Sequence, residues 1–342
     1  MNGRRVALAL GGGAARALAH VGVIEALEAA GIAPTFVAGS SMGGLVGALW
    51  AAGLSGRAIR EVARGFRFPS WFIPGGMMSW DRVFPTAVPV LAGRSFTDLP
   101  RGLSVVAADV ESGRRVVLRD GAVLPAVRAT CAVPGVLPPV RIGGRWLVDG
   151  GLVSVVPVDV AALGVPDVLI AVHVRAGVER KLPSLRHAAG WAAGRLFPNP
   201  ATAWLAFDLL VRAAEIVLDR QVALASAMIA SDVLVEVDVG TIGLRDFERL
   251  EDAATAGRLA TEAALPTIRA ALEASGSSRR LPGPVLGVDP VCDMFVDPGD
   301  APAALDSSGL RQHFCSVGCR DAFLRGRRRT AEHSIIGTHP VA

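Results

Sequence analysis

Between two apolar runs, Phe36 to Ala38 and Leu45 to Ala52, the chain reads Gly39-Ser40-Ser41-Met42-Gly43. The pattern Gly-x-Ser-x-Gly between a strand and a helix is typical of a nucleophilic serine on a sharp turn. Glycines suit both ends of the pattern because a side chain there would collide with the adjoining strand or helix. Such a turn also places the Ser41 hydroxyl at a helix N-terminus, whose dipole favours negative charge. Taken alone, the pentapeptide fits an ordinary glycine- and serine-rich turn about as well.

A glycine-rich loop precedes this turn by one predicted helix. It reads Gly11-Gly12-Gly13-Ala14-Ala15-Arg16 and follows the predicted strand Val6 to Leu10. Successive glycines leave backbone N–H groups free to bind an anion. A dinucleotide-binding loop is the competing interpretation, but Arg16 replaces the third glycine of that fingerprint and no acidic residue closes the next strand. An oxyanion hole, in which each donor contributes roughly 3 kcal/mol of transition-state stabilisation, suits the loop better.

A carboxylate closes a later predicted strand. Asp149-Gly150-Gly151 follows the strand Arg145 to Val148, and its glycines let another backbone segment approach closely. Asp-Gly-Gly is often a hairpin turn, but beside the other two motifs it indicates a base for Ser41. A carboxylate with a reference pKa of about 3.9 is a poor base at neutral pH. We therefore predict that Asp149 is desolvated, has a raised pKa and lies within hydrogen-bond reach of Ser41.

Two histidines bear on this assignment. His173 follows Ser41 and Asp149 in the chain order Ser, Asp, His of α/β-hydrolases, which leaves a full triad as an alternative. His173 also lies in the apolar run Val168 to Val174, where a buried strand histidine is the simpler expectation. We expect His20 to pack or to hydrogen-bond beneath the glycine loop.

With these motifs the chain resembles the patatin-like phospholipase family, specifically its compact bacterial members, from Arg4 to about Ala274. The resemblance rests on the glycine loop, the serine pentapeptide, Asp149-Gly150-Gly151 and the run Ala132-Val133-Pro134-Gly135-Val136-Leu137-Pro138-Pro139. It implies a catalytic dyad in which Ser41 is the nucleophile and Asp149 the base, with no cofactor for catalysis. It also implies an oxyanion hole framed by Gly11, Gly12, Gly13 and Arg16.

Length and composition predict one large α/β domain, over residues 1–274, with a small appendage. The 342 residues are 51% hydrophobic, enough for a sizeable core. Several predicted strands are continuous apolar runs, as expected of strands covered on both faces. We predict a patatin-like, doubly wound, mostly parallel sheet between helices. The predicted strands are Val6–Leu10, Thr35–Ala38, Leu103–Ala108, Arg115–Leu118, Arg145–Val148, Val168–Val174 and Val233–Val237, and the predicted helices are His20–Ala30, Gly44–Ala52, Ala203–Ser231 and Phe247–Ala274.

The chain changes character after Ala274. Residues 275–288 are rich in Ser, Gly, Pro and Arg, which predicts a linker, and a small module follows over residues 289–326. Cys315 and Cys319 are four residues apart, so a helical turn would place both sulfurs on one face, with Cys292 brought in by a hairpin. Residues 327–342 are expected to form a flexible basic tail.

The module resembles the YHS/TRASH-type metal-binding family. The resemblance implies that Cys292, Cys315 and Cys319 bind a soft metal such as zinc, copper or iron, with His313 or Asp293 as options for a fourth ligand. So small a module gains from a metal staple, and a disulfide is the alternative. The remaining cysteine, Cys131, is expected to be buried packing.

Aromatic residues concentrate in two irregular segments, 66–80, which also contains Met77 and Met78, and 191–207. Either segment could line an acyl pocket or touch lipid as a lid, and the first could equally fold onto the core. The uncharged span 29–56 contains Pro34 and several glycines, so a membrane helix is not expected. We expect a cytoplasmic protein that contacts membranes peripherally. A net charge of +4 is modest for this length, and nucleic acid is not indicated.

Two classes of function follow. The first is a serine acyl hydrolase of the phospholipase A, lysophospholipase or carboxylesterase type, which acts on a phospholipid or other acyl ester through an acyl-enzyme. The second is a non-hydrolytic lipid-binding or regulatory protein whose C-terminal module senses metal. Intact serine and aspartate motifs favour the hydrolase, because a binding protein needs neither group.

Overall fold

The computed structural model describes residues 4–68, 78–175 and 231–274, and in the C-terminal part residues 287–288, 295–296, 301, 303–307, 310–314 and 317–325. The chain divides into two compact units, residues 1–115 with 119–283, and residues 116–118 with 284–342. The predicted helix 203–231 lies outside the described residues except for its last residue. The aromatic segment 191–207 and residues 69–77 of the segment 66–80 also lie outside them.

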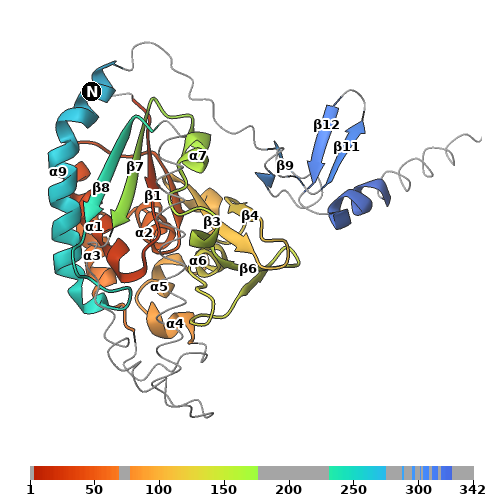
Figure 1. Cartoon of the computed structure of the whole chain (residues 1–342), viewed down its shortest axis with the longest axis horizontal. Helices are drawn as coiled ribbons and strands as arrows, with labels where there is room; N and C mark the ends of the chain where they lie inside the picture. Colours follow the sequence, from red (N-terminus) through yellow and green to blue (C-terminus); the bar gives the residue numbers. More distant parts are fainter. Residues whose placement is uncertain are drawn as a thin grey trace, which may run out of the picture. The chain divides into compact units, whose positions relative to one another are not determined.

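A mostly parallel sheet forms the centre of the first unit (Figure 1). In the order β8, β7, β1, β2, β3, every pair of neighbouring strands runs parallel. β6 pairs antiparallel with the end of β3 and forms a hairpin with β5. The bounds are β1 Val6–Leu10, β2 Phe36–Ser40, β3 Gly102–Asp109, β5 Val140–Ile142, β6 Arg145–Asp149, β7 Val168–Arg175 and β8 Val233–Asp238. This mixed, mostly parallel sheet with flanking helices fits the predicted α/β class.

Burial along the strands follows their place in the sheet. All five residues of the central strand β1 are buried, as are seven of the eight residues of β7. The last strand in the order, β8, alternates between buried and exposed residues. A strand covered on both faces needs a continuous apolar sequence, whereas one with a solvated face needs only every second residue to be apolar. The sequences VALAL and VLVEVD show these two patterns.

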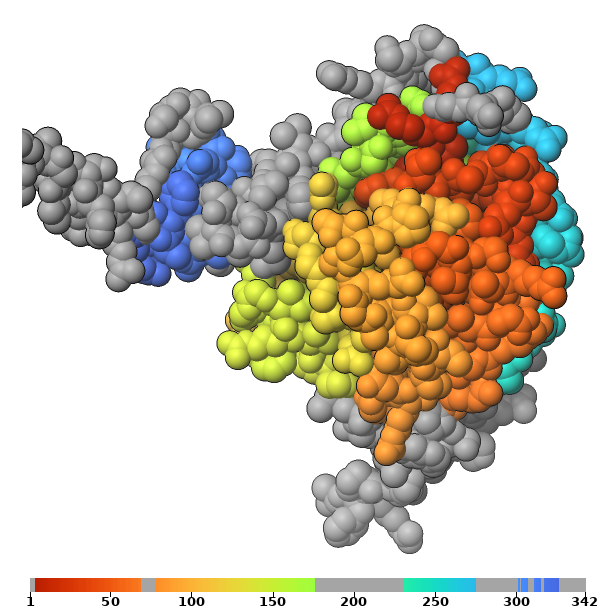
Figure 2. All heavy atoms as spheres, turned by 180° about the vertical axis from the view of Figure 1, so that it is seen from behind, coloured from red at the N-terminus to blue at the C-terminus, as the bar shows by residue number. Residues whose placement is uncertain are grey.

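The helices of the first unit surround the sheet. Their bounds are α1 Ala19–Ala29, α2 Met42–Ala51, α3 Gly56–Ala63, α4 Trp80–Val83, α5 Val88–Leu91, α6 Val123–Thr130, α7 Val158–Ala161 and α9 Leu250–Ala274, with short 3-10 segments η1 Ala14–Leu18, η2 Phe96–Asp98, η3 Gly150–Leu152, η4 Ala162–Gly164 and η6 Phe247–Arg249. Seen from the opposite side, residues from the first part of the chain, red to yellow, form most of the surface of this unit, and α9, in cyan, lies along its margin (Figure 2).

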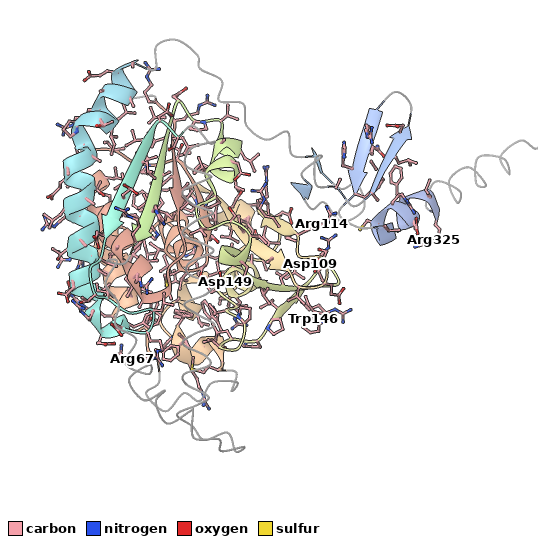
Figure 3. The ribbon with its side chains drawn as sticks, viewed as in Figure 1. Arg67, Asp109, Arg114, Trp146, Asp149 and Arg325 are labelled. Carbon is pink, nitrogen blue, oxygen red and sulfur yellow. The ribbon has the colours of Figure 1, made fainter. Side chains whose placement is uncertain are left out.

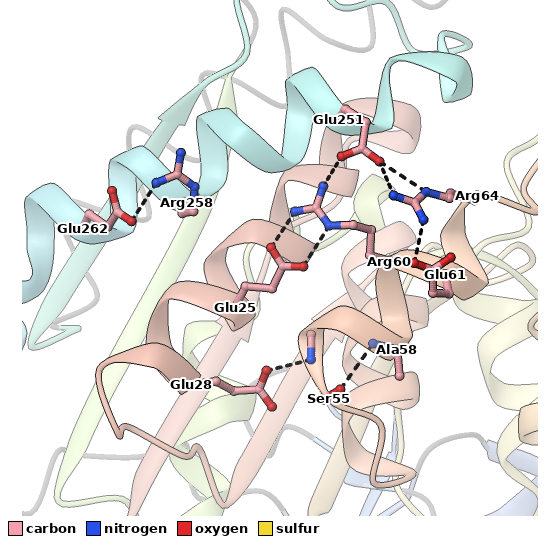
Figure 4. A network of polar contacts seen from close by, with 11 residues as sticks. Glu25, Glu28, Ser55, Ala58, Arg60, Glu61, Arg64, Glu251, Arg258 and Glu262 are labelled. Atoms are coloured by element: carbon pink, nitrogen blue, oxygen red, sulfur yellow. Dashed lines mark hydrogen bonds and ion pairs between the residues drawn. The ribbon is translucent and has the colours of Figure 1, made fainter.

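α1 and α9 pack with their backbones in contact. A Cβ added at Gly22 would lie 1.7 Å from the carbonyl oxygen of Ala254, so only glycine fits there. A network of ion pairs joins the same two helices to α3 (Figure 4). Arg60 of α3 donates to Glu25 of α1 at 2.8 and 2.5 Å and also to Glu251 of α9. Three helices that are distant in sequence are thereby held together on one side of the unit.

Residues at the two ends of the aromatic segment 66–80 belong to the core. Phe66 and Trp80 are buried, and their rings lie 5.1 and 4.9 Å from the ring of Phe84. These ends therefore fold onto the domain, as one of the two interpretations expected.

The second unit contains short strands and a helix. β4 Arg115–Leu118 contributes residues 116–118, and Val117 pairs antiparallel with Phe295 of β10 Phe295–Val296, which also pairs with β9 Gly287–Val288. β11 Ala303–Ser307 and β12 Leu310–Phe314 form a hairpin, and residues 317–325 are helical. Phe314 is buried and its ring lies 5.4 Å from that of Phe323. Within the described ranges of the whole chain, no helix is long and apolar enough to cross a membrane.

Candidate active site

The serine pentapeptide forms the turn between β2 and α2. Ser41 has φ +53° and ψ −130°, a conformation that residues other than glycine rarely adopt. A Cβ at Gly43 would lie 2.4 Å from the carbonyl oxygen of Leu10, and one at Gly39 would lie 2.5 Å from that of Gly43. The turn is therefore both strained and crowded, as the pattern predicted, and strained backbone of this kind clusters at functional sites.

Asp149 is hydrogen-bonded to Ser41. The Ser41 hydroxyl donates to Oδ2 of Asp149 at 2.6 Å, and the N–H of Gly151 donates to Oδ1 at 2.8 Å. Only 8% of Ser41 and 6% of Asp149 are exposed. Asp149, which is labelled in Figure 3, is the last residue of β6. It pairs with Ala107 of β3. A Cβ at Gly150 would lie 2.0 Å from the carbonyl oxygen of Val106, so this glycine lets β6 approach β3 closely enough for the contact.

Burial raises the pKa of Asp149 from 3.8 to about 6, although the hydrogen bonds from Ser41 and Gly151 lower it. Desolvation disfavours the charged carboxylate, and the two donors stabilise it only in part. At neutral pH the group is mostly ionised, yet it accepts a proton more readily than an exposed aspartate. A short hydrogen bond and a raised pKa are the features expected of a general base for the Ser41 hydroxyl.

The glycine loop passes over Ser41. A Cβ at Gly12 would lie 3.2 Å from Cβ of Ser41. The N–H of Gly11 donates to the carbonyl of Val172 at 3.1 Å, and that of Gly12 to the carbonyl of Val155 at 3.0 Å. Among the residues that the structure describes, the N–H of Gly13 has no acceptor. Of the three glycines proposed to frame an oxyanion hole, Gly13 is thus the one whose N–H is not engaged within this part of the protein.

Arg16 and its neighbour anchor the loop. Nε of Arg16, whose side chain is buried, donates to the carbonyl of Ile242 at 3.0 Å. The N–H of Ala15 donates to the carbonyl of Leu244 at 3.1 Å. Both acceptors lie between β8 and α9. In this geometry Arg16 ties the glycine loop to that connection.

Both histidines near the site are buried. Nε2 of His20 lies 2.7 Å from the carbonyl oxygen of Gly11. Burial, together with a smaller effect of His173, lowers the pKa of His20 to about 4, although the hydrogen bond to Gly11 raises it. His20 is therefore neutral at pH 7 and donates Nε2–H to Gly11, beneath the glycine loop as expected. His173 lies in β7, opposite Glu236 of β8.

Two residues without a predicted role at the site contact the backbone of Ser41: Thr130, which was not singled out, and Cys131, which is buried as expected. Oγ1 of Thr130 accepts the N–H of Ser41 at 2.9 Å, and Sγ of Cys131 donates to its carbonyl at 3.2 Å. Burial, and next the charge of Asp149, raise the pKa of the Cys131 thiol. Thr130 is the last residue of α6, and Cys131 follows it directly, before the Pro-rich run. The signal available in the sequence was a single threonine among the apolar residues that follow Arg128.

The predicted metal ligands fall mostly outside the described residues. Cys319 lies in the helix 317–325 and is half-buried, whereas Cys292 and Cys315 belong to the residues that are not described. Among the residues that are described, no three His, Cys, Asp or Glu side chains come together as a metal site. Metal binding by this module therefore stays a prediction.

A buried serine hydrogen-bonded to a single carboxylate, on a strained strand-to-helix turn, defines the class of site. Residues 8–162 match the family model of patatin-like phospholipases. An uncharacterized NTE family protein of Mycobacterium tuberculosis is 32% identical over 287 residues, which cover 77% of this chain and 47% of that protein. A second protein of the same description and organism is 33% identical over 226 residues, 63% of this chain and 58% of that one.

A mammalian relative matches a shorter region. Mouse patatin-like phospholipase domain-containing protein 6 is 30% identical over 204 residues, which cover 56% of this chain and 15% of the mouse protein. The aligned region spans about half the length of the mycobacterial relatives and far less of the mouse one. The family match and these relatives support the patatin-like family for the part of the chain that contains Ser41 and Asp149.

Proposed function

We propose that this protein is a serine acyl hydrolase that cleaves carboxylic esters of lipids through an acyl-enzyme. The observation that carries the proposal is the 2.6 Å hydrogen bond from Ser41 to buried Asp149 at a strained turn. The patatin-like family supports lipid substrates in general. Phospholipids, lysophospholipids and other acyl esters belong to the proposed class.

In the first half-reaction, Oγ of Ser41 attacks the ester carbonyl carbon while its proton passes to Oδ2 of Asp149. The carbonyl oxygen becomes an oxyanion, which the N–H of Gly13 is available to bind. When the tetrahedral intermediate collapses, the C–O bond to the alcohol breaks and Asp149 returns its proton to the leaving oxygen. Ser41 then carries the acyl group.

In the second half-reaction, water replaces the alcohol. Asp149 takes a proton from the water, the resulting oxygen nucleophile attacks the acyl carbon, and the Ser41–acyl bond breaks as the proton returns to Oγ. The product is a free carboxylic acid. Apart from the ester and water, each step uses only groups of this chain, and one carboxylate acts in turn as base and acid.

Hydrolysis of p-nitrophenyl esters of graded chain length tests the proposal. Ser41→Ala and Asp149→Ala should both abolish turnover. Ser40→Ala is the matched control, because Ser40 is also buried and its hydroxyl has no hydrogen-bond partner among the described residues. Preference for long acyl chains would support a lipid pocket. Absence of turnover with every ester would favour the lipid-binding alternative, and full activity of Ser41→Ala would refute the assignment.

A further inference from the structure

Thr130 joins a strand of the sheet to the serine turn. It is the last residue of α6 and is fully buried. Its hydroxyl donates to the carbonyl of Val106 in β3 and accepts the N–H of Ser41 at 2.9 Å. A hydroxyl has one proton and two lone pairs, so it can fill both roles at once.

The position of this hydroxyl follows from the sheet register. Ser40 is the last residue of β2 in register with β3, where it lies opposite Val106. Ser41 leaves the ladder because its φ is +53°. The hydroxyl of Thr130 lies between the N–H of Ser41 and the carbonyl of Val106, so a side chain bridges the two where the ladder ends.

The two polar backbone groups of Ser41 are not equally supported. Its carbonyl accepts from the N–H groups of Gly44 and Leu45, at 2.9 and 3.2 Å, as well as from Cys131. Its N–H donates to Thr130. Loss of that acceptor would leave a buried donor without a partner, which destabilises the conformation that exposes it. The hydrogen bond of the Ser41 N–H therefore depends on a single side chain, that of Thr130.

The Thr130 side chain is itself held in place. Its methyl carbon Cγ2 would lie 2.8 Å from a Cβ added at Gly44, in the first turn of α2. The absence of a side chain at Gly44 makes room for this methyl group. Thr130 is fixed by the methyl on one side and by the Val106 carbonyl on the other.

We propose that Thr130 is a positioning residue, whose hydroxyl holds the backbone of Ser41 in the conformation that aims Oγ at Asp149. This inference rests on the proposed function, because it assigns a residue that supports the same nucleophile. Thr130 touches neither the ester nor the proton in transfer. A displacement of about 1 Å at reacting atoms costs on the order of 100-fold in rate.

Three variants test the proposal: Thr130→Val removes the hydroxyl at nearly constant shape, Thr130→Ser keeps it, and Thr261→Val is a matched control. Thr261 is also fully buried, and its hydroxyl donates to the carbonyl of Gly257 at 2.8 Å within α9. With a soluble p-nitrophenyl ester, we expect Thr130→Val to lower kcat about 10- to 100-fold with little change in KM. Thr130→Ser should recover most of kcat, and Thr261→Val should leave it unchanged.

The rate at which a fluorophosphonate labels Ser41 gives a second readout, and it should fall in parallel with kcat. Equal kcat in Thr130→Val and the wild type would overturn the proposal, as would an equal loss in Thr130→Ser and Thr130→Val. If Thr130→Val does not fold, Thr130→Ala takes its place under the same criteria. An inactive wild type would instead contradict the proposed function itself.

Discussion

Asp149→Asn is expected to make the protein more stable at high pH while it abolishes hydrolysis. Burial of the ionised carboxylate raises its pKa from 3.8 to about 6. One pKa unit corresponds to about 1.4 kcal/mol, so ionised Asp149 lowers the free energy of unfolding by about 3 kcal/mol at pH 8. Asparagine removes this charge. It can keep both hydrogen bonds, with its oxygen toward the N–H of Gly151 and its NH2 group toward Oγ of Ser41.

The gain in the free energy of unfolding of Asp149→Asn over the wild type must increase with pH. Because the folded pKa is above the unfolded one, the folded state binds more protons between about pH 4 and pH 6, and wild-type stability falls as pH rises through that window. Below it the carboxyl is protonated in both states and the penalty is absent. Asparagine does not titrate. The advantage of Asp149→Asn should therefore be about 3 kcal/mol at pH 8 and about half as large at pH 5.

Urea unfolding followed by tryptophan fluorescence at pH 5 and pH 8 measures this difference. Asp109→Asn is the control, because Asp109 is equally buried but accepts from the N–H of Glu111 and the hydroxyl of Ser112 and lies 3.8 Å from Arg145. Its charge is compensated, so we expect no stabilisation. An Asp149→Asn protein no more stable than the wild type at pH 8 would refute the reasoning. A gap of the same size at both pH values would also refute it.

Three further outcomes are expected. kcat/KM for a neutral ester should rise with pH and level off above an apparent pKa of about 6, because Asp149 must be ionised to act as base; a profile that titrates near 4, where His20 does, would contradict that role. Arg60→Ala should lower the free energy of unfolding by about 1 to 3 kcal/mol, because Glu25 and Glu251 lose the mostly buried arginine that they share. Arg258→Ala is the control: it removes an exposed ion pair with Glu262 and should change the free energy of unfolding by no more than about 0.5 kcal/mol. The purified protein should contain about one equivalent of zinc or another soft metal that Cys319→Ser lacks, as elemental analysis would show, and a metal-free wild type would argue against the predicted module.

The local parts of this fold were predictable from the sequence. β1 occupies the predicted residues, and the strands around it differ from prediction by one or two residues at their ends. Continuous apolar runs and glycines at a strained turn are local signals. The first reflects burial on both faces of the sheet, and the second reflects a lack of space for a side chain. The contact between Ser41 and Asp149 could be anticipated because a weak nucleophile needs a base, and the chain offers a carboxylate at a strand end.

Other features depend on contacts that a sequence does not display. The carbonyls of Val172 and Val155 accept hydrogen bonds from the N–H groups of Gly11 and Gly12, respectively. The glycine loop therefore offers fewer free donors than its composition implied. Thr130 accepts a hydrogen bond from Ser41, which lies 89 residues earlier in the chain. It is placed there by α6, a short helix that contains a proline and was not predicted. A long-range hydrogen bond from a backbone N–H to one hydroxyl leaves no periodic pattern in the sequence.

The most direct test of the central claim is to find where a fluorophosphonate attaches to the intact protein. Phosphonylation expels fluoride and leaves a stable adduct on an activated serine, which peptide mass spectrometry can locate. We predict one adduct, on Ser41, formed at the same rate in Ser40→Ala, far more slowly in Asp149→Ala and not at all in Ser41→Ala. An adduct on another residue, or labelling of Ser41 that is as fast without Asp149 as with it, would contradict the assignment of these two residues as nucleophile and base.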